Sequence, residues 1–154
     1  MNSSRVVFCD FDGTITTQDT FISVVEKFAP QAAAQTFPAL FRREISLKEG
    51  IDKTLGKIAV QNYPAMIEFI AQHPVRPGLK EFIEFLNNAT IPFVVISGGL
   101  TGMVQAVLEH HQLMDGVTAI YAGEVATNDE FLQPYCAISS DTEFVAKEIA
   151  MAQY

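Results

Sequence analysis

Three short apolar runs predict the strands of a parallel sheet. The runs are Arg5 to Asp10, Pro92 to Ser97 and Val117 to Ala122. Each is rich in β-branched or aromatic residues, which is typical of strands buried on both faces. The first two runs end in "DFDGT" and "SGG", as a strand that leads into a polar turn would. We therefore expect an α/β, Rossmann-like core in which helices cover the sheet.

The segments between these runs predict helices and one hairpin. Apolar residues recur at i, i+3, i+4 and i+7 after Pro77, which indicates an amphipathic helix. A second helix is expected after "SGG", over 100–113, and a third over 140–154. The third would begin with a capping box formed by Ser140 and Glu143. Between Tyr121 and Tyr135 the pattern indicates a small hairpin that turns at "TNDE".

A helical insertion separates the first two strands. A parallel crossover needs only a dozen or more residues, and this one is far longer. Ser46 and Glu49 would cap one of its helices, and Pro64 suits the first turn of another. Ligands of α/β sheets bind at the carboxyl ends of strands, so an insertion there would form a lid. We expect two parts, a core of residues 1–16 and 75–154 and a cap of residues 17–74.

The composition supports a globular protein and excludes several partners. Hydrophobic residues make up 49% of the 154 residues and charged residues 18%, so a sizeable core can form. The formal net charge of −8 argues against a nucleic-acid surface. The N-terminal residues lack the pattern of a secretory signal, and no run reaches the roughly 20 apolar residues of a membrane span. We expect a cytoplasmic protein that binds neither nucleic acid nor membrane.

Asp10 and Asp12 are the main candidates for chemistry. Side chains alternate along a strand, so the two carboxylates would leave the strand end on nearly the same side. They repel each other unless a cation lies between them or one is protonated. Oxygen ligands without histidine favour Mg²⁺. One carboxylate could then form an aspartyl-phosphate while its neighbour transfers protons. The alternative is a plain turn, which Asp and Gly also favour.

The second strand offers an anion site at its end. Ser97 carries a hydroxyl, and Gly98 and Gly99 leave backbone N–H groups accessible before a helix begins. Such a turn could hold a phosphate, or it could simply cap the following helix.

The chain resembles a known superfamily, the haloacid dehalogenase-like phosphohydrolases. "DFDGT" after a hydrophobic strand resembles their motif I, and "ISGG" resembles their motif II. The helical insertion directly after motif I is similar to the cap of the phosphoserine-phosphatase-like branch. Within that branch, "FCDFDGTIT", "LKEG", "RPG" and "PFVVISGG" resemble most the phosphatases that act on the enol phosphate of methionine salvage. Phosphoserine is the alternative substrate that the resemblance implies.

The resemblance implies a role for each candidate residue. Asp10 would be the nucleophile and a Mg²⁺ ligand. Asp12 would be the general acid and base and would bind the metal through its backbone carbonyl. Thr14, Ser97, Gly98 and Lys147 would hold the phosphate of a small phosphorylated metabolite, as the family's motifs I to III imply. A solvated helix lysine is the alternative for Lys147.

The family's motif IV, a strand that ends in paired acids, has no match before Tyr154. In the family this strand lies beside the first strand, so its absence would leave Val6 to Asp10 at an open edge. We expect either an incomplete core, in which case the chain is part of a longer phosphatase, or a homodimer that pairs this edge. A catalytically inactive binding or regulatory protein with the same fold is the third reading.

Other polar and aromatic residues received weaker predictions. Asp19 could line the site because it follows motif I closely. Arg76, at the return to the core, could contact an anionic group of a substrate, although a solvated side chain is the simpler expectation. Phe28, Phe37 and Phe41 are expected in the core of the cap.

Overall fold

The computed structural model describes residues 5–154. The strands are β1 (Val7–Asp10), β2 (Phe93–Leu100), β3 (Ala119–Ala126) and β4 (Gln133–Tyr135). The α-helices are α1 (Thr20–Phe28), α2 (Pro30–Phe41), α3 (Leu47–Thr54), α4 (Tyr63–Ala71), α5 (Leu79–Asn88), α6 (Thr101–His110) and α7 (Lys147–Gln153). Short helical turns are η1 (Phe11–Ile15), η2 (Leu55–Lys57), η3 (Val60–Asn62) and η4 (Met114–Gly116).

The strands form one mostly parallel sheet in the order β1-β2-β3-β4. Cys9 in β1 lies opposite Val95 in β2, and Val95 lies opposite Ile120 in β3. β4 runs antiparallel to β3 and pairs Gln133 with Ala126, which confirms the predicted hairpin. The α/β fold expected from the apolar runs is therefore present.

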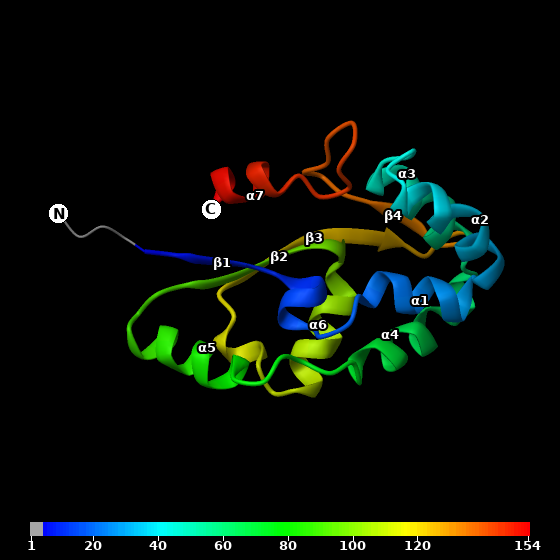
Figure 1. The fold of residues 1–154 in the computed structure, drawn as a ribbon. Helices are drawn as coiled ribbons and strands as arrows, with labels where there is room; N and C mark the ends of the chain where they lie inside the picture. Colours follow the sequence, from blue (N-terminus) through cyan, green and yellow to red (C-terminus); the bar gives the residue numbers. More distant parts are fainter. Residues whose placement is uncertain (1–4) are drawn as a thin grey trace.

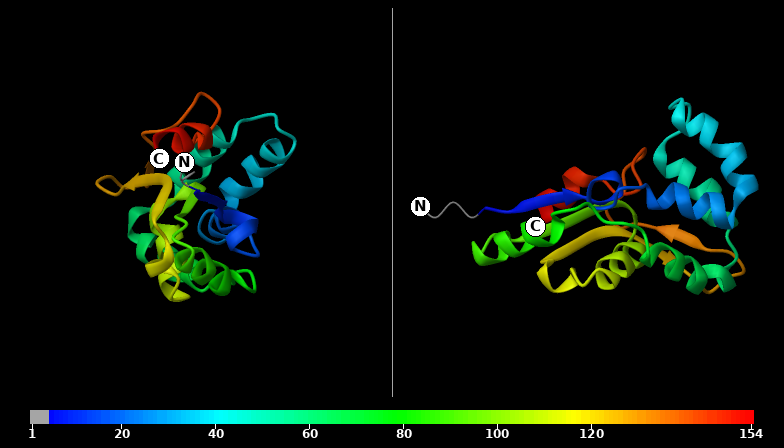
Figure 2. Two further views of the ribbon diagram at one scale, coloured as in Figure 1. Left: turned by 90° about the vertical axis from the view of Figure 1, so that its left-hand side faces the viewer. Right: turned by 60° about the horizontal axis from the view of Figure 1, so that its bottom comes forward.

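Helices cover both faces of the sheet. Helices α5 and α6 lie on one face and α7 lies on the other, while α1 to α4 lie beyond the carboxyl end of β1 (Figures 1 and 2). The stretch between β1 and α5 is helical, as predicted. Ser46 accepts a hydrogen bond from the backbone N–H of Glu49 at 3.1 Å, and Pro64 lies in the first turn of α4.

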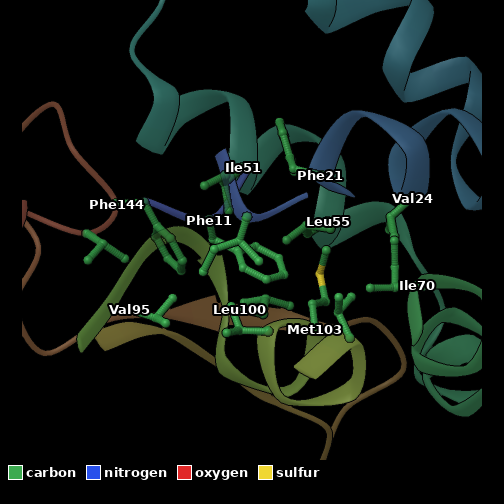
Figure 3. Close-up of a cluster of buried hydrophobic side chains, with 14 of the residues drawn as sticks. Phe11, Phe21, Val24, Ile51, Leu55, Ile70, Val95, Leu100, Met103 and Phe144 are labelled. Carbon is green, nitrogen blue, oxygen red and sulfur yellow. The ribbon is translucent and has the colours of Figure 1, made fainter. Parts of the chain in front are cut away.

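The core is continuous between the inserted helices and the sheet. Ile51 and Leu55 come from the insertion, and Leu100 and Met103 come from β2 and α6; all four are at most 1% exposed. Figure 3 shows them in one cluster with Phe11, which begins the turn after β1. Burial of apolar side chains from both parts holds the insertion beside the strand ends.

The structure corrects three local predictions. The last helix begins at Lys147 and not at 140, because residues 144–146 are buried against the sheet in a non-helical conformation. The Ser140 hydroxyl still accepts a hydrogen bond from the N–H of Glu143, at 3.0 Å, without starting a helix. The second strand does not stop at Ser97 but continues to Leu100, after a register shift against β3. Phe41 is 62% exposed and does not belong to a core.

Within residues 5–154, β1 hydrogen-bonds to β2 and to no other strand. Over the same residues, no helix combines the length and the hydropathy needed to cross a membrane.

Candidate functional site

The turn after β1 places two carboxylates next to each other. Asp10 ends β1, and Asp12 lies in the tight turn η1 that follows. Gly13 has φ of 71°, a left-handed conformation that glycine adopts without the strain other residues meet. Asp10 ends β1 and Asp12 lies in the turn directly after it, so both carboxylates lie at the carboxyl edge of the sheet.

Asp10 is held by a lysine and a threonine. The Lys147 ammonium donates to Oδ1 of Asp10 and forms an ion pair with it. The Thr14 hydroxyl donates to Oδ2 at 3.4 Å. The carboxylate is thus fixed through both oxygens, and a positive charge lies beside one of them.

Asp12 is fixed by the first residue of α1. The backbone N–H and the hydroxyl of Thr20 both donate to Oδ1 of Asp12, at 2.7 and 2.6 Å. Burial raises the pKa of Asp12 to about 6, and the nearby carboxylates of Asp19 and Asp10 add to this rise. The hydrogen bonds from Thr20 act in the opposite direction. A carboxyl group with a pKa near neutrality can both give and take a proton.

The end of β2 packs against η1, the turn that follows β1. Ser97 is fully buried, and its hydroxyl oxygen accepts a hydrogen bond from the N–H of Gly99 at 3.0 Å. A Cβ placed on Gly99 would lie 3.8 Å from Oδ2 of Asp12. The glycine turn therefore packs directly against the second carboxylate, which joins the two polar strand ends in one site.

The inserted helices also border the glycine turn at the end of β2. A Cβ on Gly98 would lie 3.4 Å from Cδ2 of Leu47, the first residue of α3. Leu47 is 40% exposed, so an apolar side chain borders the glycine turn. The neighbouring Lys48 donates its ammonium to the carbonyl of Ser140 at 3.0 Å, and its N–H bonds the carbonyl of Thr142. These contacts tie α3 to the loop that precedes α7.

The connection between core and insertion is a short antiparallel pair of segments. The N–H of Thr17 bonds the carbonyl of Pro74 at 3.0 Å, and Thr16 pairs with Val75. Arg76 follows and donates Nε to the carbonyl of Thr14 at 2.9 Å and Nη2 to the carbonyl of Gly13 at 2.7 Å. Arg76 is exposed, as expected from the sequence, and its guanidinium also binds the turn that carries the two carboxylates.

Most of the predicted site residues lie together. Asp10 contacts Thr14 and Lys147, and Asp12 lies beside the glycine turn of Ser97. The sequence interpretation missed Thr20 and did not assign Arg76 to the site. Thr20 directly follows Asp19, whose side chain caps α1 by accepting from the N–H of Ile22 at 2.9 Å. The Asp-Thr pair before an apolar helix is the sequence signal that could have pointed to Thr20.

Asp10 and Asp12 together offer the kind of oxygen ligands that Mg²⁺ prefers. Mg²⁺ commonly takes one or two protein carboxylates and completes its shell with water and phosphate oxygens. Asp12 lies close enough to Asp10 and Asp19 for their charges to raise its pKa, so a cation there would relieve repulsion. Among residues 5–154, no cluster of three or more His, Cys, Asp or Glu side chains is arranged around a metal position. The fit therefore rests on the Asp10–Asp12 pair.

The family model for haloacid dehalogenase-like hydrolases matches residues 7–150. The chain belongs to this family. It is 43% identical over 151 residues to the 2-hydroxy-3-keto-5-methylthiopentenyl-1-phosphate phosphatase of Microcystis aeruginosa, a match that covers 98% of this chain and 72% of the relative. The resemblance seen in the sequence motifs is thereby confirmed.

Solved structures share the fold. An apo phosphoserine phosphatase superposes with a TM-score of 0.69 at 19% identity, over 98% of this chain and 72% of that chain. A phosphoserine phosphohydrolase-like protein from Francisella tularensis superposes with a TM-score of 0.59 at 18% identity. The chain covers 63% of the length of that second protein, and 92% of its own residues take part.

Proposed function

We propose that this protein is a Mg²⁺-dependent phosphatase that hydrolyses a small phosphomonoester through an aspartyl-phosphate on Asp10. The observation that carries this proposal is the pairing of Asp10 with Lys147 beside a second carboxyl group, Asp12, whose pKa is raised to about 6. One carboxylate is paired with the Lys147 ammonium, and the other can carry a proton near neutral pH.

In the first half-reaction, an oxygen of Asp10 attacks phosphorus and the bond from phosphorus to the ester oxygen breaks. Asp12 gives its proton to the departing oxygen, so the alcohol or enol leaves neutral. Lys147 and Thr14 hold the nucleophile in place. In the second half-reaction, water attacks the phosphorus of the aspartyl-phosphate and Asp12 accepts the water's proton. Inorganic phosphate leaves and Asp10 is regenerated.

The phosphate would lie between the ends of β1 and β2. Ser97 and the N–H of Gly98 are the proposed donors on one side, and the Lys147 ammonium and the backbone N–H of Thr14 on the other. Asp10 and Asp12 would hold the Mg²⁺, the latter through its backbone carbonyl. When bound, the ion supplies positive charge that offsets the negative charge of phosphate and carboxylates.

Residues 17–74 act in this proposal as a cap on a core made of residues 1–16 and 75–154. The contact between Leu47 and Gly98 supports this assignment, because the insertion borders the proposed phosphate site. A lid in this place would exclude water during phosphoryl transfer. We also predict that the outer edge of β1 is closed by a further strand or by a homodimer. A cytoplasmic location is a separate prediction.

The substrate we propose is the enol phosphate of methionine salvage. It is the phosphate ester in the name of the Microcystis relative. Leu47 supports this choice, because its half-exposed apolar side chain suits a substrate with a thioether group better than one with charged groups. The leaving group of such a substrate is an enol.

The proposal is tested by steady-state turnover of three substrates. p-Nitrophenyl phosphate reports phosphatase chemistry, and the enol phosphate and phosphoserine compete for the assignment of the natural substrate. We expect turnover that requires Mg²⁺, stops with EDTA and is lost in Asp10→Asn. Asp115→Asn, an exposed carboxylate on the core, is the matched control and should keep full activity.

The outcomes separate the alternatives. A higher kcat/KM for phosphoserine than for the enol phosphate would overturn the substrate assignment. Turnover that survives in Asp10→Asn would overturn the mechanism. Absence of turnover with every substrate, in protein that still binds inorganic phosphate, would favour the inactive binding protein.

A further inference from the structure

Arg76 binds three consecutive carbonyls of the turn that carries the two carboxylates. Its backbone N–H donates to the carbonyl of Ile15 at 2.8 Å. Its Nε donates to Thr14 and its Nη2 to Gly13, at 2.9 and 2.7 Å. A guanidinium group is a rigid planar fork, so two bonds from one side chain fix the relative orientation of two neighbouring peptide groups.

These bonds hold the most adaptable part of the turn. Gly13 can adopt many conformations, and its φ of 71° is only one of them. In a trans peptide the C=O and N–H point in opposite directions, so fixing the carbonyls of Gly13 and Thr14 also fixes the next two N–H groups. The same bonds set the direction of the Thr14 side chain, whose hydroxyl contacts Oδ2 of Asp10. Arg76 is thus connected to Asp10 through Thr14.

The arginine also lies at the junction with the insertion. It directly follows Val75, which pairs with Thr16, and Thr17 bonds Pro74 in the same pair of segments. The chain that returns from the inserted helices therefore ends on the carbonyls of the turn. Arg76 therefore connects the chain that returns from the inserted helices directly to the turn that carries Asp10 and Asp12.

The exposure of these groups indicates what the contact does. Arg76, Gly13 and Thr14 are all exposed. Hydrogen bonds between groups that water can reach add little to the free energy of unfolding. The bonds instead restrict which conformation the turn adopts, and their loss should alter geometry more than stability. Both the Nε and the Nη2 are already bonded to carbonyls, so this side of the guanidinium is not free to bind an anionic substrate group.

We propose that Arg76 is a positioning residue for the phosphatase reaction, in which its guanidinium holds the Gly13–Thr14 peptide groups and thereby keeps Thr14 and Asp10 in the reactive arrangement. The inference rests on the proposed function, because it concerns the rate of phosphoryl transfer to Asp10. A positioning residue acts on kcat, since it contacts the turn and not the substrate.

The test compares Arg76→Ala and Arg76→Lys with Arg42→Lys. Arg42 is a matched control because it is an exposed arginine whose Nε and Nη2 bind one partner, the carboxylate of Glu44. With p-nitrophenyl phosphate and Mg²⁺, we expect kcat to fall by about 10- to 100-fold in Arg76→Ala and by less in Arg76→Lys. KM should stay within about twofold, and the thermal midpoints should match that of the wild type.

Chemical rescue separates positioning from a general structural role. Free guanidinium at millimolar concentration should restore part of the kcat of Arg76→Ala, while Arg42→Lys should not respond. A kcat of Arg76→Ala within about twofold of wild type would overturn the proposal, and so would a loss confined to KM, which would indicate direct substrate contact. If Arg76→Ala fails to fold, the same criterion applies to Arg76→Lys: a kcat equal to that of the wild type would overturn the proposal.

A second measurement does not depend on turnover. In ¹⁵N-labelled protein without substrate, Arg76→Lys should speed amide hydrogen exchange at Gly13 and Thr16, whose N–H groups bond the Thr16 hydroxyl and the Phe11 carbonyl within the turn. Unchanged exchange there would contradict the inference even if the wild type proved to be an active phosphatase. Faster exchange in a protein that turns over no phosphomonoester would uphold the role of Arg76 in the turn and reject only the proposed function.

Discussion

Lys147 and Asp10 form an ion pair across 137 positions of the chain. The lysine is the first residue of α7, and the aspartate is the last residue of β1. The pair therefore depends on the buried segment that precedes α7 as much as on β1, the strand that carries the proposed nucleophile. Phosphate bound at this position would face a positive charge that is already oriented.

Removing this charge should reduce the rate severely. We expect Lys147→Met to lower kcat for p-nitrophenyl phosphate by about 10²- to 10³-fold, the range seen when a positioned electrostatic group is lost. The matched control is Lys53→Met, because Lys53 is also a helix lysine in an ion pair, with Glu49 at 3.0 Å. The measurement is the steady-state kcat of both variants with p-nitrophenyl phosphate. Equal activity of the two variants would place Lys147 outside the reaction.

The hydroxyl of Thr20 should tune the proton transfer by Asp12. Thr20→Val removes the donor at 2.6 Å and leaves the backbone N–H at 2.7 Å. Because that hydrogen bond lowers the pKa of Asp12, its loss should move the alkaline limb of the kcat/KM profile to higher pH. We also expect kcat to fall about tenfold.

Ser23→Ala is the control for this change. It removes another hydroxyl of α1, which bonds the carbonyl of Asp19 at 2.8 Å and does not contact Asp12. A pH profile that shifts equally in both variants would mean that the effect arises from α1 as a whole.

Asp12 should lower the stability of the metal-free protein. Burial raises its pKa from 3.8 to about 6, so the folded state binds the proton more tightly than the unfolded state. Stability is then lost as the pH rises from about 4 through 6, and the loss is complete above that range. In EDTA at pH 7.5, Asp12→Asn should raise the free energy of unfolding by about 1–3 kcal/mol.

Denaturant unfolding at several pH values checks this prediction. The gain from Asp12→Asn should shrink below pH 4 and vanish below about pH 3, where the wild-type carboxyl is protonated in both the folded and the unfolded state. Asp52→Asn removes one exposed carboxylate and should change stability by less than about 0.5 kcal/mol. A destabilised Asp12→Asn at pH 7.5 would show that the ionised group is better accommodated than its burial indicates.

Local sequence signals located β1 and its two carboxylates because the strand and the turn depend on neighbouring residues. The apolar run, the paired aspartates and Gly13 all lie within a few positions of each other. The parallel sheet and the hairpin followed from the same periodicities. The contribution of Lys147 was inferred from the family resemblance, since its partner is distant in sequence.

Other features depend on contacts that no local pattern reveals. Residues 140–146 carry a capping-box sequence, yet burial of Phe144 and its neighbours overrides it and α7 starts later. No local pattern revealed the contact of Arg76 with the turn, because its acceptors lie 62 and 63 positions earlier and are backbone atoms that every residue has. Thr20 acts through its place at the start of α1, which only the folded turn brings to Asp12.

The fit of Phe144 against β3 gives a stability prediction. A Cβ on Gly123 would overlap Cε1 of Phe144, and Phe144 is 2% exposed. Gly123→Ala should therefore destabilise the protein by about 1–3 kcal/mol and lower the activity, because the displaced segment leads to Lys147. Gly56→Ala is the control, since its Cβ would meet Leu132 at an ordinary 3.9 Å. Equal thermal midpoints of the two variants would contradict this account of the packing.

The most direct test of the central claim is to trap the phosphorylated enzyme. Wild-type protein mixed with Mg²⁺ and a phosphomonoester, quenched in acid within its turnover time and digested, can be mapped by mass spectrometry. The mechanism predicts one hydroxylamine-sensitive phosphoryl group on Asp10, absent from Asp10→Asn. Turnover in which Asp10 never carries phosphate, or in which another residue carries it, would contradict the account.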